Sequence, residues 1–266
     1  MPLPAPTPGP ATRRSRGLGG LARPGIALLI LACVGLWGCD AFEQSADLPI
    51  AGPPLGPLEP GAIRYICSEF PFDPAILEAP ANDEQADTRF AAALRALIEP
   101  PVRPHLPKTG WHLLGSDDDS AEFVTGSAQD GLTLVAVDPW EGLVRAVEYG
   151  SCQPELVYLP PVRIAEWEPD PEGRLGRDTT TFVALVTERE CASGQAAIGR
   201  IVAPTLAFLD DRVLIAFGTV PPVGDGVATC QGNPPVPIRV DLGQPLGDRV
   251  LVDPAIWPPK EFPAPN

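Results

Sequence analysis

The sequence has few of the residues from which catalytic and nucleic-acid sites are usually built. Its only histidines are His105 and His112, and its only lysines are Lys108 and Lys260. Acidic residues outnumber basic ones by 34 to 19, so the formal net charge is −15. Nucleic acids and anionic membrane surfaces repel a chain of this charge. The composition therefore argues against both as partners.

Motifs that carry a specific chemistry are also missing. The chain has no G-x-S-x-G motif and no closely spaced cysteine or histidine pairs. The glycine-rich segment 224–226 follows an expected strand, but no helix is expected after it, and a phosphate loop needs glycines that open a helix. We therefore predict no nucleotide site, no cofactor and no catalytic residue. A Ser-His-acid triad would have to use His105 or His112, which we interpret as structural or exposed residues.

Long uninterrupted helices are excluded by proline. The chain has 36 prolines and 26 glycines among 266 residues, whereas proline averages about 5% in proteins. Proline interrupts helices, so an all-helical protein or a coiled coil is not expected. Apolar residues make up 44% of the chain and charged residues 20%, which is enough apolar material for a packed core.

The only long apolar run is too short to cross a membrane. It covers residues 26–37, whereas a spanning helix needs roughly 18 residues. Arg13, Arg14, Arg16 and Arg23 precede it without any acidic residue. A basic flank before a short apolar run is the layout of a secretory signal peptide. No apolar pair follows Arg13 and Arg14, so we interpret them as an ordinary basic flank rather than a twin-arginine signal.

The end of this run, Leu36-Trp37-Gly38-Cys39, resembles the lipobox of bacterial lipoproteins. The resemblance implies that residues 1–38 are a signal peptide and that Cys39 carries a diacylglyceryl thioether as the first residue of the mature protein. The protein would then be lipid-anchored in the cell membrane or envelope, outside the cytoplasm. A second match at residues 30–33 would leave a shorter apolar core. A plain signal peptide or an uncleaved anchor would also account for the basic flank and the apolar run.

The cysteine count predicts two disulfides. If Cys33 leaves with the signal peptide and Cys39 is lipidated, as the resemblance implies, four of the six cysteines remain. An even number of cysteines in an exported chain is typical of disulfides. Four cysteines allow three connectivities, and we favour Cys67–Cys152 with Cys191–Cys230 because each pair then closes one half of the chain. Metal ligation and a catalytic thiol are less favoured roles for these cysteines.

Proline-rich stretches divide the mature chain into segments. We expect a tether over 39–61, an α+β domain over 62–160, a linker over 161–179, a small all-β domain over 180–253 and a proline-rich tail over 254–266. The fold class is a combination of α+β and all-β, mostly antiparallel with one clear helix.

The expected elements follow from apolar periodicity. Phe90, Leu94 and Ile98 form one apolar stripe of a helix over 84–98, and Asn82 with Gln85 resembles a capping box before it. In the first domain this helix packs on a meander of short strands that follows a first strand over 63–70. The second domain is expected to be sandwich-like. Its strands are expected over 180–188, 201–209, 212–220, 237–242 and 249–253.

The weak candidates for a metal site are Asp117, Asp119 and His112. Three successive aspartates at 117–119 offer carboxylate oxygens to a cation such as Ca²⁺. An EF-hand loop that began at Asp117 would require glycine and glutamate where Glu122 and Ala128 stand, so that match fails. An acidic hairpin turn is the favoured interpretation, and we predict no metal.

These observations predict an exported, lipid-anchored cell-envelope protein with a non-catalytic binding or scaffolding role. Its partners would be the membrane, through the lipid, and a protein of the envelope. The alternative is an envelope hydrolase that uses carboxylates or a bound metal. An acidic pocket that holds His112 or the 117–119 turn would favour the hydrolase, and an exposed apolar patch would favour a protein partner.

Overall fold

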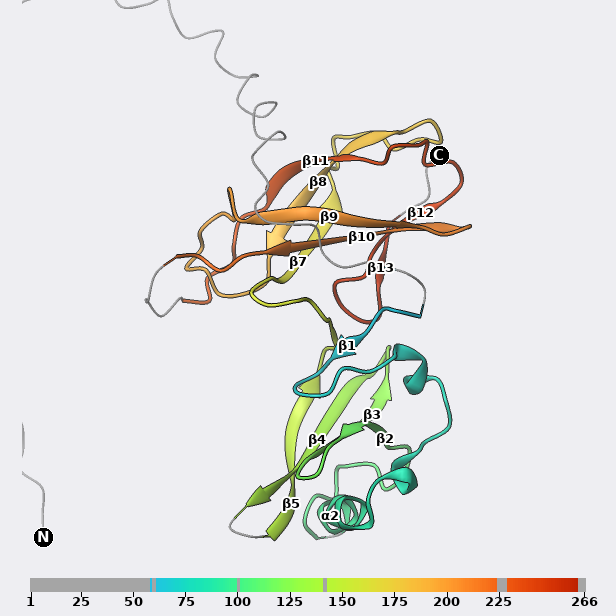
Figure 1. The fold of residues 1–266 in the computed structure, drawn as a ribbon, viewed down its shortest axis with the longest axis vertical. Helices are drawn as coiled ribbons and strands as arrows, with labels where there is room; N and C mark the ends of the chain where they lie inside the picture. The colour runs from blue at the N-terminus through green and yellow to red at the C-terminus, as the bar shows by residue number, and fades with distance from the viewer. Residues whose placement is uncertain (1–57, 59–60, 100, 141–142, 224–228, 263–266) are drawn as a thin grey trace, which may run out of the picture. The chain divides into compact units, whose positions relative to one another are not determined.

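The computed structural model describes Leu58 and residues 61–99, 101–140, 143–223 and 229–262 (Figure 1). These residues belong to one compact unit, Asp40–Asn266. The predicted signal peptide, Cys39 and the predicted tether, apart from Leu58 and Gly61, lie outside the described residues. The described part consists mostly of antiparallel strands in three sheets, with a single α-helix among its residues.

The first large sheet has four antiparallel strands in the order β2-β3-β4-β5. Their bounds are His112–Ser116, Ala121–Ser127, Gly131–Trp140 and Leu143–Cys152. Helix α2, Thr88–Ile98, lies against β4 and β5 (Figure 1). Phe90, Leu94 and Ile98 are buried on it against Trp111 and the inward side chains of the sheet. The predicted apolar stripe is therefore the contact between helix and sheet.

The start of α2 differs from the predicted capping box. Asp87 is the N-cap, and its carboxylate accepts a hydrogen bond from the Arg89 N–H. Asn82 instead precedes the short 3₁₀ helix η2, Asp83–Gln85, and makes no side-chain cap there. Its side-chain oxygen accepts a hydrogen bond from the Leu113 N–H at 2.7 Å. Asn82 therefore covers the open edge of β2 rather than the helix end.

The second large sheet has seven strands in the order β11-β8-β7-β10-β12-β13, with β9 also paired to β10. Their bounds in chain order are Arg163–Pro169, Thr181–Glu188, Ile201–Phe208, Arg212–Thr219, Val236–Asp241, Val250–Asp253 and Lys260–Glu261. Strand β10 is central because it pairs antiparallel with β7 and β9 and parallel with β12. The single sheet replaces the sandwich-like pair of sheets that the sequence suggested.

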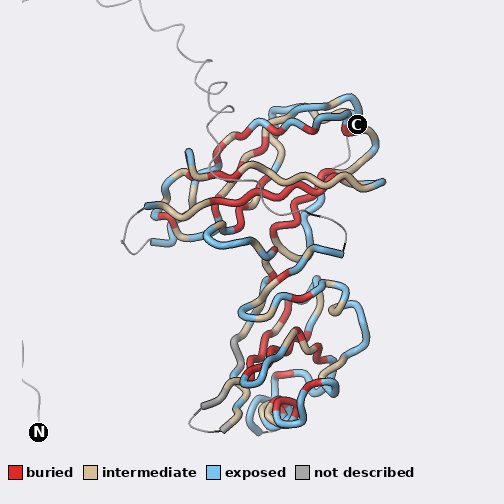
Figure 2. Tube along the Cα trace, viewed as in Figure 1, coloured by how far each residue is buried: buried red, intermediate tan, exposed pale blue. Residues whose placement is uncertain are grey.

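Both faces of the central strand β10 are buried. Along β10, Val213, Ile215 and Phe217 face one core, while Leu214 and Ala216 face another. The period of two is that of a strand covered on both sides. Figure 2 shows buried residues along the middle of this sheet. Trp167 of β7 is 2% exposed, packs against Phe217 and Phe262, and donates its indole N–H to the Ile215 carbonyl at 2.7 Å.

Two predicted irregular segments contain strands. The predicted linker 161–179 includes β7, which pairs with both β8 and β10. The predicted proline-rich tail includes β13, which pairs with β12, and Phe262, which is buried in the core. Polar and proline residues dominate the sequence around both strands, but the strands are held by partners distant along the chain. The two ranges are therefore part of the sheet at these positions.

A third, two-stranded sheet joins β1, Tyr65–Ile66, to β6, Glu155–Leu156. It replaces most of the strand predicted over 63–70. Around it lies a core cluster with residues of both large sheets, among them Val124, Leu134, Leu214 and Val252. Leu58, within the predicted tether, is buried in the same cluster. The segment η1, Pro74–Leu77, begins at Asp73, whose carboxylate accepts the Ala75 N–H.

Candidate functional site

The structure contains two disulfides, and they have the favoured pairing. Cys67–Cys152 joins the segment after β1 to the end of β5, with the Cα atoms 5.7 Å apart. Cys191–Cys230 joins the loop after β8 to the segment before β11, with the Cα atoms 4.5 Å apart. Such bonds form and persist in oxidising compartments, so they indicate an extracytoplasmic environment. These four cysteines are not thiols and cannot serve as nucleophiles or metal ligands while the disulfides are intact.

The acidic turn 117–119 is organised by its own backbone. The Asp117 carboxylate accepts hydrogen bonds from the Asp119 N–H at 2.8 Å and the Ser120 N–H at 2.7 Å. These donors, the Ser120 N–H first, lower the pKa of Asp117. The carboxylate closes the turn between β2 and β3, which is the structural role that the sequence favoured.

The third weak metal candidate, His112, lies in β2 and is 8% exposed. Its Nδ1 atom is buried without a hydrogen-bond partner. Burial lowers the pKa of His112, and the nearby Asp83 carboxylate opposes that shift. Within the described ranges, no three histidine, cysteine, aspartate or glutamate side chains are grouped so as to hold a metal ion. Asp117, Asp119 and His112 are thus not brought together.

Three buried carboxylates hold main-chain segments or neighbouring charges in place. Glu188, at the end of β8, faces the Arg200 guanidinium at 2.7 Å and the Thr219 hydroxyl. Glu122, on β3, accepts hydrogen bonds from the Glu69 and Phe70 N–H groups. A Cβ at Gly115 would lie 2.6 Å from the Phe70 Cβ, so glycine at this position of β2 lets the segment that contains Glu69 and Phe70 lie against the strand. Each carboxylate is already satisfied by groups of the fold.

The third carboxylate, Asp253 at the end of β12, is 1% exposed. It accepts the Trp167 N–H at 3.0 Å and the Ala255 N–H at 2.9 Å. Burial raises its pKa to about 7, and the two N–H donors oppose that shift. Next to it, the buried Tyr65 hydroxyl donates to the Pro254 carbonyl at 3.0 Å. Asp253 thereby connects β12 to β7. Because its pKa is about 7, its charge changes near neutral pH.

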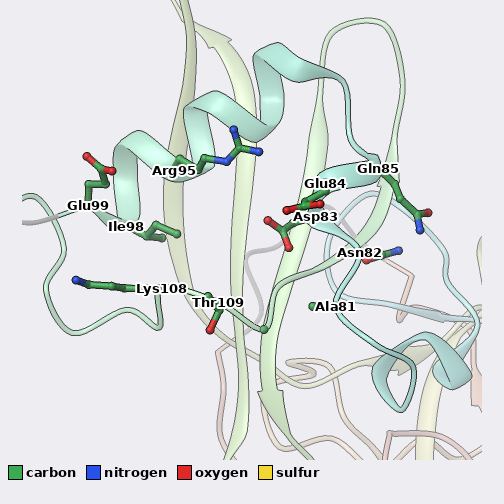
Figure 3. Close-up of a pocket in the computed structure, with 11 residues that line it drawn as sticks. Ala81, Asn82, Asp83, Glu84, Gln85, Arg95, Ile98, Glu99, Lys108 and Thr109 are labelled. Atoms are coloured by element: carbon green, nitrogen blue, oxygen red, sulfur yellow. The ribbon is translucent and has the colours of Figure 1, made fainter.

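A pocket with a volume of about 620 Å³ lies between η2, the second half of α2 and residues 108–110. Asp83, Glu84 and Glu99 contribute carboxylates to its wall, and Arg95 and Lys108 contribute cations. Figure 3 shows Arg95 and Ile98 on α2 and Glu99 just after it, with Asp83 and Glu84 on the η2 side. Asn82, Gln85 and Thr109 add polar groups. We refer to this as the α2 pocket.

A smaller pocket of about 380 Å³ lies beside the Cys191–Cys230 disulfide. Its charges neutralise one another. Arg189 forms ion pairs with Glu166 and, at 3.4 Å, with Glu155. Glu190 is 3.7 Å from the Arg163 guanidinium. Arg189 and Glu190 in the wall of this pocket are therefore already paired with side chains of the protein, unlike Arg95 and Lys108 in the α2 pocket.

The α2 pocket was not predicted from the sequence. Its three walls come from residues 81–85, 95–99 and 108–110, and no periodic pattern connects them. The only local signal is the i,i+4 spacing of Arg95 and Glu99, which is common on exposed helix faces. His112 and the 117–119 turn line neither of the two pockets.

Comparison of the chain with protein-family models, with curated proteins and with solved structures finds no match to any of them. Among the described residues, no helix is both long enough and apolar enough to span a membrane. Function therefore has to be inferred from the sequence and the site geometry.

Proposed function

We propose that the protein is an exported, lipid-anchored protein of the cell envelope with a non-catalytic binding role. The lipobox-like sequence that ends at Cys39 supports the anchor, and the two disulfides support export. The anchor would hold the folded part at a membrane surface, where a small molecule or a protein of the envelope is its partner. Its acidic character disfavours nucleic acid.

The observation that carries the binding role is the lining of the α2 pocket. It has charged and amide groups in a cavity of about 620 Å³, within the usual size range of ligand sites. Its only side-chain hydroxyl is that of Thr109, and no histidine lies in the lining to accept a proton from it. Such a wall is suited to holding a polar ligand rather than to activating a nucleophile.

One observation favours the alternative of an envelope hydrolase. Asp83, Glu84 and Glu99 offer three carboxylates to a single pocket, and paired carboxylates can serve as acid and base in glycoside hydrolysis. The two functions differ in their response to Glu84→Gln and Glu99→Gln. A binding protein shows no turnover of a chromogenic glycoside before or after these substitutions. A hydrolase turns the glycoside over and loses that activity in one of the variants.

The anchor and the disulfides are tested together by the intact mass of the protein purified from membranes. We expect a chain that begins at Cys39 with the added mass of a diacylglyceryl group. We also expect four cysteines that react with an alkylating reagent only after reduction. A Cys39→Ser variant should remain unlipidated, whereas Cys33→Ser should leave the mature mass unchanged. An unlipidated wild-type chain with freely reacting thiols would contradict the proposal.

A further inference from the structure

Residues 254–257, which follow β12, join the two-stranded β1–β6 sheet to the seven-stranded sheet. The Leu156 N–H of β6 donates a hydrogen bond to the Ala255 carbonyl at 2.9 Å. The Trp257 N–H donates to the Pro154 carbonyl, also at 2.9 Å. We refer to residues 254–257 as the junction segment. Its main-chain hydrogen bonds hold the end of β12 against the β1–β6 sheet.

A buried carboxylate immediately precedes the junction segment. Asp253 is 1% exposed, and its hydrogen-bond donors in the described part of the chain are the main-chain N–H groups of Trp167 and Ala255. No ion pair joins it to a cation among the described side chains. Glu188, by contrast, faces the Arg200 guanidinium. Asp253 is therefore a buried acid whose negative charge has no counterion.

The charged side chains on the neighbouring strands do not supply that counterion. Lys260 of β13 lies opposite Asp253 in the ladder, but its ammonium group is 3.6 Å from the Glu168 carboxylate and its side chain is 51% exposed. Glu166 of β7 is paired with Arg189. The positive charge of Lys260 and the negative charge of Glu166 act on Asp253 in opposite directions.

Two tyrosines near Asp253 have hydroxyl protons that are already used. The Tyr65 hydroxyl of β1 donates to the first carbonyl of the junction segment at 3.0 Å, and the Tyr158 hydroxyl donates to the Phe217 carbonyl at 3.1 Å. Burial raises the pKa of both tyrosines, and the Asp253 charge raises it further, so both stay neutral. Glu155 of β6 adds another acid beside Tyr158. An ionised Asp253 thus gains no further donor from these side chains.

We propose that Asp253 makes the contact between the junction segment and the β1–β6 sheet depend on pH, so that the contact opens more readily once this carboxyl group is ionised. A buried charge without a counterion is stabilised by water, and water reaches Asp253 only when a neighbouring segment moves. The junction segment is the neighbour joined to it directly in the chain. This property goes beyond the proposed binding role and depends on neither the anchor nor the α2 pocket.

The Cys67–Cys152 disulfide determines which parts separate. It joins the residue after β1 to the last residue of β5, shortly before β6, and so keeps β1 and β6 together. The Val157 N–H donates to the Arg64 carbonyl at 3.0 Å, which extends the pairing of the two strands. Opening should therefore release the junction segment from an intact β1–β6 sheet.

The test is hydrogen exchange of individual amides, followed by NMR on the full-length chain in detergent micelles and expressed as protection factors. The pKa of Asp253 is about 7 in the closed state and returns toward 3.8 when water reaches it. The protection of the Leu156 and Trp257 amides should therefore fall at least ~10-fold between about pH 5 and pH 8. The Val157 amide, bonded to β1, should keep its protection. Equal falls at all three amides, or no fall at any of them, would overturn the inference.

Two variants assign the response to Asp253. Asp253→Asn removes the charge and keeps an oxygen that accepts hydrogen bonds, so the Leu156 and Trp257 amides should lose their pH dependence. Glu122→Gln is the matched control, because Glu122 is also buried and also accepts two main-chain N–H groups, but lies on β3. It should respond to pH as the wild type does. A response that persists in Asp253→Asn would contradict the proposal.

Glu155 is the competing source of a pH response, because it lies on β6 itself. Burial raises its pKa, and Arg189, 3.4 Å away, opposes that shift. Glu155→Gln should leave the response in place. If the response instead disappears in Glu155→Gln, the assignment to Asp253 is wrong. Should Asp253→Asn fail to fold, the wild-type comparison of the Leu156 and Val157 amides still decides whether the junction segment opens separately.

Discussion

The four-stranded sheet with α2 and the seven-stranded sheet differ in how their charged side chains are used. In the seven-stranded sheet, Glu188 has no exposed side-chain surface and is neutralised by Arg200, while Asp253 receives two main-chain N–H groups. In the α2 region, Arg95 and Lys108 line a cavity together with Asp83, Glu84 and Glu99, and no ion pair joins these side chains within the described part of the chain. The buried charges are occupied by groups of the fold, whereas charges left around a cavity are available to a ligand.

The largest effect is expected at the buried ion pair. Arg200→Leu leaves Glu188 as a buried charge without its partner, so the free energy of unfolding should fall by about 3–5 kcal/mol, as measured by urea unfolding. The control is Arg177→Leu, which removes an ion pair with Asp248 whose side chains are 66% and 73% exposed. That loss should be about 0–1 kcal/mol. Similar losses in both variants would remove the distinction between buried and exposed pairs.

The next effect depends on pH and arises at Asp253. Its pKa in the folded protein, about 7, is raised above the ordinary value of 3.8. The stability that it contributes is therefore fully present below about pH 4 and is lost as the pH rises through 7. At about 1.4 kcal/mol per pKa unit, the loss amounts to at most about 4 kcal/mol. Other titrating groups also change the unfolding free energy with pH. The quantity to measure is therefore the difference in unfolding free energy between the wild type and Asp253→Asn at each pH.

That difference should decline steadily between pH 4 and pH 7 in urea unfolding experiments. Asparagine at position 253 carries no charge, so the variant lacks this part of the pH dependence. Parallel curves for the two proteins would show that Asp253 keeps the same charge over this range.

Each of the two regions has one disulfide, so removing them one at a time compares how much each contributes to stability. Replacing both cysteines of a pair by alanine should cost about 2–4 kcal/mol of unfolding free energy for each bridge. Cys67–Cys152 closes a sequence separation of 85 residues and Cys191–Cys230 one of 39, so removal of the first should cost slightly more. Thermal unfolding of the two double variants measures the order. A larger loss for the shorter loop would indicate that chain entropy does not dominate.

The smallest effect is expected at His112 and has the opposite pH direction. Burial lowers its pKa in the folded protein, so the unfolded chain takes up a proton at a higher pH than the folded chain does. The stability that it contributes is lost as the pH falls below about 6.5. A His112→Leu variant should lose less stability than wild type between pH 7 and pH 5. An identical loss in both would assign the acid response to other residues.

Local patterns were enough to place most of the strands and the helix. The apolar stripe of Phe90, Leu94 and Ile98 predicted the packed face of α2, and the strands expected over 180–188, 201–209 and 212–220 correspond to β8, β9 and β10. In these segments the side chains that face the core recur with the period of the element itself. The even cysteine count predicted two disulfides, and the pairing that was favoured among three possible ones rested on the expectation that each bond closes one half of the chain.

The missed elements depend on distant partners. Strand β7 lies in a stretch whose end, Glu168-Pro169-Asp170-Pro171, looks like a linker, yet Trp167 is held by the Ile215 carbonyl and by Asp253. Strand β13 follows two prolines and exists because β12 pairs with it. Asn82 was predicted to cap the helix because asparagine is a common N-cap residue. Its side-chain oxygen instead accepts a hydrogen bond from the Leu113 N–H of β2. None of these partners is visible within a short window of sequence.

The sequence by itself determined the fold class, the helix and most strands, because each rests on residue type or on a local period, and it left three pairings of the four cysteines open. The tertiary structure alone decided the seven-stranded order around β10, the burial of Glu188 and Asp253, and the α2 pocket. These features join residues far apart in the chain, and their free energies come from burial and from charge separation in space. A short window of sequence does not show which distant residues come into contact, so it cannot predict these features.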